Sequence, residues 1–278
     1  MQLELNDEQR MIQAVAREFA DKEVRPIAAA IDRDARFPRD TVRRMGELGL
    51  MGIAVPEAHG GSGSDTVAYA VALEEVAKAC ASHAVIMSVN NSLYCGPVHA
   101  HGTEAQKRRF LAPFASGQKL GCFSLTEPEA GSDATNQHTL ATPDGDGYVL
   151  NGRKIFVTNG REAAAALVFA QTDRAKGHHG IGAFLVEKGT KGFTVVKTED
   201  KLGIRASDTA EFLFDNCRVP AANRLGEEGR GFGIAMAALD GGRLGIAAQA
   251  LGIATAADRK STRLNSSHSR ASRMPSSA

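Results

Sequence analysis

The chain has little cysteine and no long apolar run, and both absences narrow its class. Its four cysteines, Cys80, Cys95, Cys122 and Cys217, are scattered among 278 residues without a C-x-x-C pair, which favours reduced thiols over a disulfide framework or a zinc site. No segment approaches the roughly 20 consecutive apolar residues of a membrane-spanning helix. The N-terminal segment M-Q-L-E-L-N-D-E-Q is acidic and enters a helical pattern at once. It resembles neither a secretory signal nor a transit peptide, so we expect a cytoplasmic protein.

The chain also lacks a strong excess of charge of either sign. Its net charge of +1 arises at the C-terminal end, where residues 259–278 carry five Lys or Arg and no acidic residue. Without that segment, 28 basic residues remain against 32 acidic ones, which gives no reason to expect nucleic-acid binding. An apolar content of 43% and a charged content of 23% are typical of a globular protein, and the length favours two or more domains.

Residues 1–118 show helical patterns throughout. Asn6 with Gln9, and Thr103 with Gln106, each match a capping box, in which two side chains satisfy the free backbone N–H groups at a helix start. We therefore predict an N-terminal all-α domain over 1–118.

The apolar period changes after residue 118. Asn151-Gly152 is a strong signal for a two-residue hairpin, and Asp144-Gly145-Asp146-Gly147 indicates another turn. Several short β-rich segments separated by turns predict a β-barrel or sandwich over 119–224. These segments are 122–125, 138–141, 148–150, 154–157, 167–171, 182–186, 194–197 and 211–214.

A helical period returns near Gly231, and we assign 225–258 to the start of a C-terminal helical domain. Its expected apolar stripe consists of Ile234, Leu239, Ile246 and Leu251. Residues 259–278 have no amphipathic stripe, and Lys260 to Ala278 contain seven serines. We predict that this tail is non-native or disordered; the alternative is a functional Ser/Arg-rich tail.

The segment Cys122–Asp133, C-F-S-L-T-E-P-E-A-G-S-D, is the most specific pattern. A strand breaks at Pro128 and ends in small polar residues that expose backbone donors and hydroxyl groups, a common arrangement for planar or phosphorylated ligands. Together with Asn151–Asn159, N-G-R-K-I-F-V-T-N, it resembles the flavin-binding signature of the acyl-CoA dehydrogenase family. The resemblance implies an α+β multidomain fold with a helix, sheet, helix domain order. It also implies FAD, a short- or branched-chain acyl-CoA substrate undergoing α,β-dehydrogenation, electron transfer to an electron-transfer flavoprotein, and a homotetramer.

The resemblance also implies roles for individual residues. Thr126 would hydrogen-bond the pyrimidine end of the flavin, and Thr158 would donate to flavin N5. Phe156 stands where the family usually has tryptophan and would form an aromatic wall. The implied cofactor-binding residues are Phe123, Leu125, Thr126, Gly131, Ser132, Phe156, Val157 and Thr158. Taken singly, each segment could also be an ordinary strand and turn.

Asp240-Gly241-Gly242-Arg243 resembles the CoA-contacting Asp-x-x-Arg of the same family, with Ser132 implied near the CoA arm. The two glycines fit either a passing pantetheine chain or close helix packing, and the sequence leaves both open. In some branches the catalytic Glu directly precedes this arginine, but here Gly242 holds that position. The resemblance therefore implies a base beyond this chain, in a C-terminal domain that is truncated here, so the catalytic residue is unknown.

Other patterns in the sequence give weaker evidence of a functional site. His99 and His101 lack Cys or carboxylate neighbours, so we expect no metal site. Gly229, Gly231 and Gly233 resemble a dinucleotide loop, but no strand that would open a βαβ unit precedes them. Two alternatives to the dehydrogenase remain: an acyl-CoA oxidase or flavin monooxygenase of the same fold, and a non-catalytic acyl-CoA-binding protein.

Overall fold

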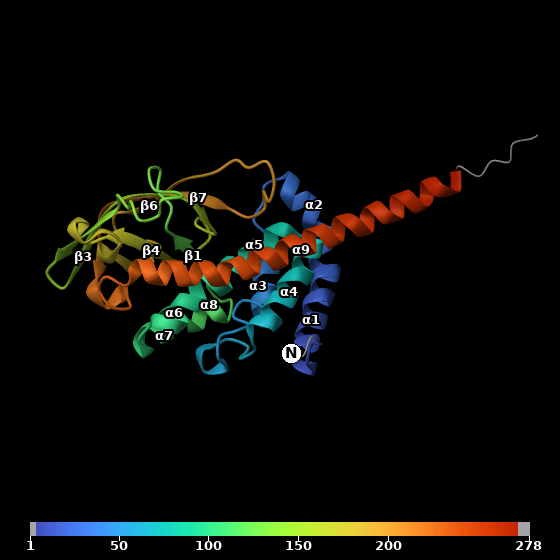
Figure 1. Ribbon diagram of the computed structural model, residues 1–278, viewed down its shortest axis with the longest axis horizontal. Helices are drawn as coiled ribbons and strands as arrows, with labels where there is room; N and C mark the ends of the chain where they lie inside the picture. The colour runs from blue at the N-terminus through green and yellow to red at the C-terminus, as the bar shows by residue number, and fades with distance from the viewer. Residues whose placement is uncertain (1–3, 272–278) are drawn as a thin grey trace, which may run out of the picture.

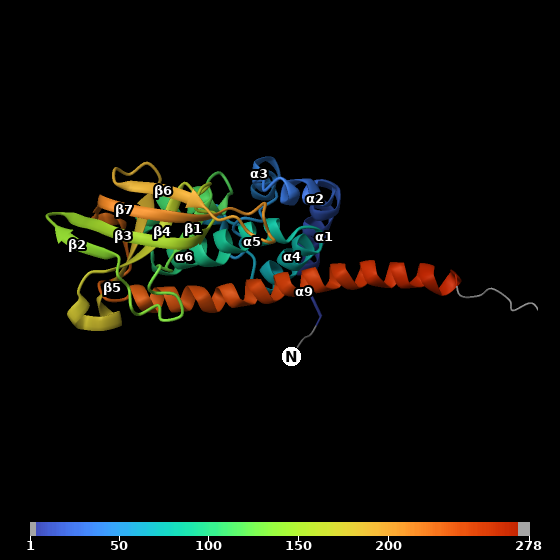
Figure 2. The same ribbon diagram turned by 90° about the horizontal axis from the view of Figure 1, so that it is seen from above.

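The computed structural model describes residues 4–271, with side chains up to residue 260. Helices α1–α5 gather at one end of the molecule and the strands at the other, while the long helix α9 runs alongside both (Figures 1 and 2). None of the helices in this range combines the length and apolar character needed to cross a bilayer.

The N-terminal part is helical, and both predicted capping boxes are confirmed by reciprocal hydrogen bonds at Asn6/Gln9 and Thr103/Gln106. A π-helical turn η1 (Ala20–Val24) joins α1 to α2, and a second, η3 (Val89–Cys95), joins α5 to α6. A short 3-10 helix, η2 (Glu57–His59), lies before α4. The helices are α1 (Asp7–Phe19), α2 (Arg25–Arg33), α3 (Arg39–Glu47), α4 (Thr66–Ala79), α5 (Ala81–Ser88), α6 (Gly96–His101), α7 (Glu104–Phe110) and α8 (Ala112–Ala115).

The strands form one sheet in the order β6-β7-β3-β2-β4-β5-β8, with β1 added parallel to β4. Strand β4 is buried on both faces: Leu167 and Phe169 pack toward α6–α8 and the start of α9, while Val168 and Ala170 face the aromatic core on the other side of the sheet. The strands are β1 (Gly121–Ser124), β2 (Leu140–Asp144), β3 (Gly147–Thr158), β4 (Ala165–Gln171), β5 (Ile181–Glu187), β6 (Phe193–Thr198), β7 (Thr209–Pro220) and β8 (Arg224–Leu225). Short 3-10 helices η4 (Arg174–Gly180) and η5 (Ala221–Asn223) connect them.

The hairpin predicted at Asn151-Gly152 is wrong, because β3 continues through it. The register of β3 against β7 shifts between Leu150 and Gly152, and Gly152 has φ 149°. A side chain there would clash, since an added Cβ would lie 2.5 Å from Thr139 Oγ1. This glycine therefore serves a β-bulge. The turn predicted over 144–147 is confirmed as the β2–β3 hairpin, with Gly145 at φ 58°.

Helix α9 (Gly231–Ala271) starts beside β5 and packs across η3, α5 and α4. Its close approach requires glycine: an added Cβ at Gly245 would lie 2.3 Å from Tyr69 Oη, and at Gly252 2.5 Å from the Glu74 carbonyl. The predicted apolar stripe does not form one face. Ile234 is buried and Leu239 is partly buried, whereas Ile246 and Leu251 are 51% and 54% exposed.

The helix continues to Ala271, past residue 258, where the sequence predicts its end. The described residues 259–271 are therefore helical and not disordered, while residues 272–278 of the predicted tail lie outside the described range. The foreign origin of 259–278 stays a prediction.

Candidate functional site

A cleft of about 430 Å³ opens where β1, the loop after it and β3 face η3 and α9. Apolar side chains from both sides, including Leu93, Ile155 and Met236, form much of its wall. The structure brings eight of the sequence-predicted residues together here: Phe123, Leu125, Thr126, Gly131, Ser132, Phe156, Thr158 and Arg243.

Phe156 occupies an irregular position in β3. The register against β7 shifts between Lys154 and Val157, and Phe156 has φ 57°, a conformation that costs a bulky residue about 1–3 kcal/mol. The bulge leaves the Phe156 side chain at the cleft, 61% exposed, while Val157 is buried in the sheet core at 1% exposure. Val157 therefore lies apart from the other predicted residues. An exposed aromatic ring on a strained backbone is typical of a ligand site. The sequence pattern carries no signal for the bulge or for the positive φ at Phe156.

The four residues of the Asp240–Arg243 motif on α9 lie in different environments. Asp240 and Arg243 form an exposed ion pair, and of the two only Arg243 lines the cleft. Gly242 is a packing glycine, because an added Cβ would lie 2.8 Å from Leu93 Cδ2. Gly241 has no atom within 4 Å of an added Cβ and lines a second, apolar cavity of about 230 Å³ between α4, α6 and α9. Of the two glycines, therefore, only Gly242 is required by close helix packing.

Besides Thr135, whose hydroxyl donates to Asp133, three residues with hydroxyl groups line the cleft: Thr126, Ser132 and Thr158. None of these three hydroxyls hydrogen-bonds another residue in the part of the chain that the structure describes. Together with the Phe156 ring, they offer an aromatic face and free polar groups at its edge. This combination suits a flat ligand with hydrogen-bonding edges.

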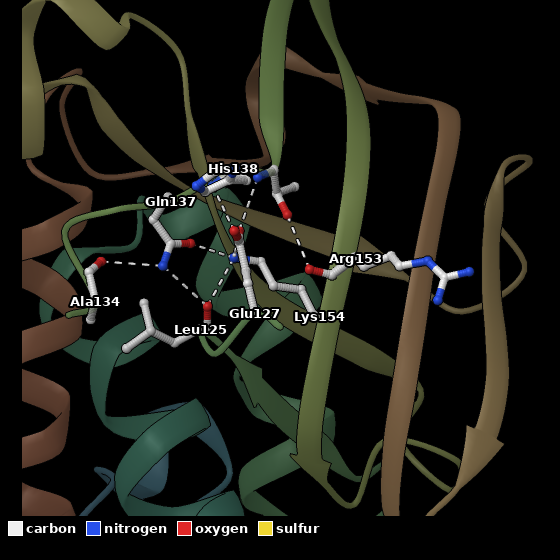
Figure 3. Close-up of polar contacts among 8 residues, drawn as sticks. Leu125, Glu127, Ala134, Gln137, His138, Arg153 and Lys154 are labelled. Carbon is white, nitrogen blue, oxygen red and sulfur yellow. Dashed lines mark hydrogen bonds and ion pairs between the residues drawn. The ribbon is translucent and has the colours of Figure 1, made fainter. Parts of the chain in front are cut away.

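A buried polar network joins the loop after β1 to strand β3, two of the segments that line the cleft (Figure 3). Lys154 has no exposed side-chain surface, and its Nζ donates to the Leu125 carbonyl at 2.9 Å, to Glu127 Oε1 at 2.7 Å and to Gln137 Oε1. Burial lowers the pKa of Lys154 to about 8, although the negative charge of Glu127 opposes the shift. Sequence reasoning missed all three residues: a charged residue in a strand, such as Lys154, ordinarily faces solvent, and Glu127 and Gln137 lie in a loop without a local signal of burial.

One carboxylate, Asp133, lines the cleft among the described residues. It accepts hydrogen bonds from the Thr135 backbone N–H at 3.2 Å and from the Thr135 hydroxyl at 2.5 Å. These bonds hold the pKa of Asp133 below its usual value, which makes it a weak base. Among the side chains that the structure describes, up to residue 260, no group of His, Cys, Asp and Glu is arranged to hold a metal ion, His99 and His101 included.

Comparison with known proteins agrees with this geometry. Residues 6–118 match the family model "Acyl-CoA dehydrogenase, N-terminal domain", and residues 122–217 match "Acyl-CoA dehydrogenase, middle domain". The chain is 51% identical to a short-chain specific acyl-CoA dehydrogenase of Clostridium acetobutylicum over 92% of its own length and 68% of the relative's. It is 54% identical to the mitochondrial short-chain specific enzyme of Mus musculus, covering 91% of this chain and 62% of the relative.

The solved structure of butyryl-CoA dehydrogenase from Megasphaera elsdenii matches with a TM-score of 0.90 and 48% identity, covering 92% of this chain and 68% of that one. The chain thus spans about two thirds of the length of these relatives. The predicted resemblance and the predicted fold class, helical domain, sheet domain and a C-terminal helix, are both confirmed. The chain belongs to the acyl-CoA dehydrogenase family.

Proposed function

We propose that this chain forms the N-terminal and middle parts of a short-chain acyl-CoA dehydrogenase that uses FAD, the cofactor of its family. The observation that carries the proposal is the cleft itself, which places an exposed Phe156 ring beside the unpaired hydroxyls of Thr126, Ser132 and Thr158. The reaction would be α,β-dehydrogenation of a short or branched acyl-CoA, with electrons passed to an electron-transfer flavoprotein.

The residues present fit FAD in type and placement. Bound FAD supplies the acceptor for the hydride that leaves the substrate Cβ. Phe156 and Phe123 offer aromatic surface to a planar ring, while Thr126 and Thr158 can donate hydrogen bonds to its polar edge. A donor fixed in advance stabilises charge that develops on the ring, without reorganisation during the reaction.

The substrate would approach from the α9 side of the cleft. Arg243 provides a cation for a phosphate-bearing ligand, and Ser132 faces the same cleft from the loop after β1. Leu93 and Met236 provide apolar surface for a short acyl chain. Excluding water from this surface would strengthen the polar contacts made at the reacting atoms.

The proposed general base is a Glu in the part of the relatives' length that this chain does not span. Asp133 is unsuited to the role, because its hydrogen bonds with Thr135 stabilise its charged form. A homotetrameric, cytoplasmic parent enzyme completes the proposal.

The test joins residues 1–258 of this chain, without the predicted non-native tail, to the corresponding C-terminal third of the Megasphaera elsdenii relative. We expect FAD binding and butyryl-CoA-dependent reduction of an artificial electron acceptor, with a matched no-substrate control. Binding of acyl-CoA without flavin bleaching would instead indicate a non-catalytic binding protein. Reoxidation of the reduced flavin within seconds in air-saturated buffer would indicate an oxidase or monooxygenase.

A further inference from the structure

The network around Lys154 holds both ends of the loop that lines the cleft. Glu127 Oε2 accepts a hydrogen bond from the backbone N–H of His138, and Glu127 Oε1 accepts both the backbone N–H of Thr139 at 3.0 Å and the ammonium group of Lys154. Gln137 Nε2 donates to the carbonyls of Leu125 at 3.3 Å and Ala134 at 3.2 Å. Side chains and backbone from the start and the end of the 125–139 segment therefore meet at one buried point (Figure 3).

The network also joins this loop to the strand that carries Phe156. Lys154 lies two residues before Phe156, and the backbone N–H of Ile155 donates to the Thr126 carbonyl at 2.9 Å. The cleft-lining residues Thr126 and Ser132 lie between the anchored ends of the loop. Any shift of the Lys154 ammonium group would therefore move both segments relative to each other.

Stability alone is a weak reason for such a pair. Removing Lys154 and Glu127 from water is costly, and well-packed apolar residues of similar size often give equal or greater stability. An ammonium group does supply something that an apolar side chain lacks: three donors diverging from one atom, which match the three acceptors of Leu125, Glu127 and Gln137. The three hydrogen bonds of Lys154 therefore specify the geometry of the 125–139 loop.

We propose that Lys154 is a positioning residue for the cleft, fixing the 125–139 loop so that Thr126 and Ser132 face Phe156 across a set distance. The inference rests on the proposed function in one respect, since the ligand for which the loop is positioned is FAD. The position of the loop itself is a property of the chain without ligand.

The first experiment measures amide hydrogen exchange of the 278-residue chain without FAD. Lys154→Met/Glu127→Gln removes both charges but keeps an oxygen for the backbone N–H groups of His138 and Thr139. We expect exchange across 126–139 to accelerate about tenfold or more, because hydrogen bonds to charged groups are lost, while exchange in β4 and β5 stays unchanged.

Arg153→Met is the matched control. Arg153 is adjacent on β3 but exposed, and its ion pair with Glu211 points away from the loop. It should leave loop exchange unaltered. A double variant that folds and exchanges its loop like the wild type would overturn the proposal. Global unfolding of the double variant, together with normal loop exchange in Gln137→Leu, would also overturn it and assign the pair to fold stability.

The second experiment titrates FAD into wild type and variants and follows flavin fluorescence, in a chain that contains no tryptophan. We expect the dissociation constant of the double variant to rise about tenfold with an unchanged melting temperature of the ligand-free protein. Equal affinity in both would contradict positioning. If the wild type binds no FAD even with the added C-terminal third, the proposed function fails, whereas loop exchange still decides the role of Lys154.

Discussion

The two walls of the cleft are built on different physical principles. On the sheet side, a strained aromatic residue stands before a fully buried ion pair, and each donor of Lys154 has an acceptor. On the α9 side, Phe232, Met236 and Leu239 line the cleft. Farther along, the helix packs closely on its neighbours through glycines, and much of its outward surface is apolar and exposed. The sheet wall is thus set by directional bonds and the helix wall by shape.

This difference determines how each wall responds to change. A directional network fails sharply when one partner is removed, because the others remain buried without a bond. A helix packed through small residues depends instead on what covers its open face. The sheet wall should therefore be sensitive to single substitutions and the α9 wall to its surroundings.

The largest effect is expected for Glu127→Ala, which leaves the buried Lys154 ammonium group without its counter-charge and two backbone N–H groups without their acceptor. The free energy of unfolding should fall by about 3–5 kcal/mol in urea denaturation. Asp144→Ala, which breaks the exposed ion pair with Arg218, is the control and should cost no more than about 1 kcal/mol. An equal loss of unfolding free energy in the two variants would show that the buried network does not control the sheet wall.

A pH effect of similar size is expected in the helical part. His83 is fully buried with Nε2 2.7 Å from the Thr41 hydroxyl, and burial lowers its pKa to about 4. The unfolded chain, with a histidine pKa of about 6.5, takes up the proton first as the pH falls. Stability is therefore complete above about pH 6.5 and decreases toward pH 4, by roughly 3 kcal/mol in total.

His83→Gln should flatten this dependence, as measured by urea denaturation at pH 7 and pH 4.5. His138→Gln, a change at an exposed histidine, should keep the wild-type slope. The same slope in His83→Gln as in wild type would show that other groups control acid sensitivity.

The features that sequence patterns could predict are those with local signals. Capping boxes depend on residues three apart, and the Asp144–Gly147 turn needs only its own glycines. The two segments that resemble the family's flavin-binding signature are specific strings of residues, so their meeting at one cleft is what the resemblance implies.

The remaining features depend on contacts far along the chain. The alternation of a strand cannot reveal that β3 bulges at Phe156, because the bulge exists only relative to β7. Lys154 looks like a solvent-facing strand residue until Glu127 and Gln137 arrive from the preceding loop. On α9, helical periodicity marks apolar positions, but Gly245 and Gly252 decide which face is buried.

A smaller, kinetic effect is expected from Thr158→Val in the chain completed with a relative's C-terminal third. The change keeps the shape of the side chain but removes one preorganised donor at the cleft. Reduction of bound flavin by butyryl-CoA should slow by roughly one to two orders of magnitude, within the effect known for such donors. Stopped-flow absorbance measures the rate, and unchanged kinetics with normal FAD content would contradict the role of Thr158.

The smallest effect in free energy concerns the outward face of α9. Leu244 and Leu251 on this face are 53% and 54% exposed. Ile246 and Ile253 are exposed as well, and exposed alanines lie between the two pairs. An apolar surface of this extent favours association in water. Leu244→Gln/Leu251→Gln should raise the concentration at which the chain self-associates by roughly tenfold, since part of the 1.5–3 kcal/mol per buried leucine is lost. Met11→Gln, at a residue 60% exposed on α1, should leave association unchanged. Sedimentation velocity over a range of concentrations measures self-association of both variants. Because neither leucine lines the cleft, FAD affinity should stay constant. A double variant that associates like the wild type would show that α9 is not the surface through which copies meet.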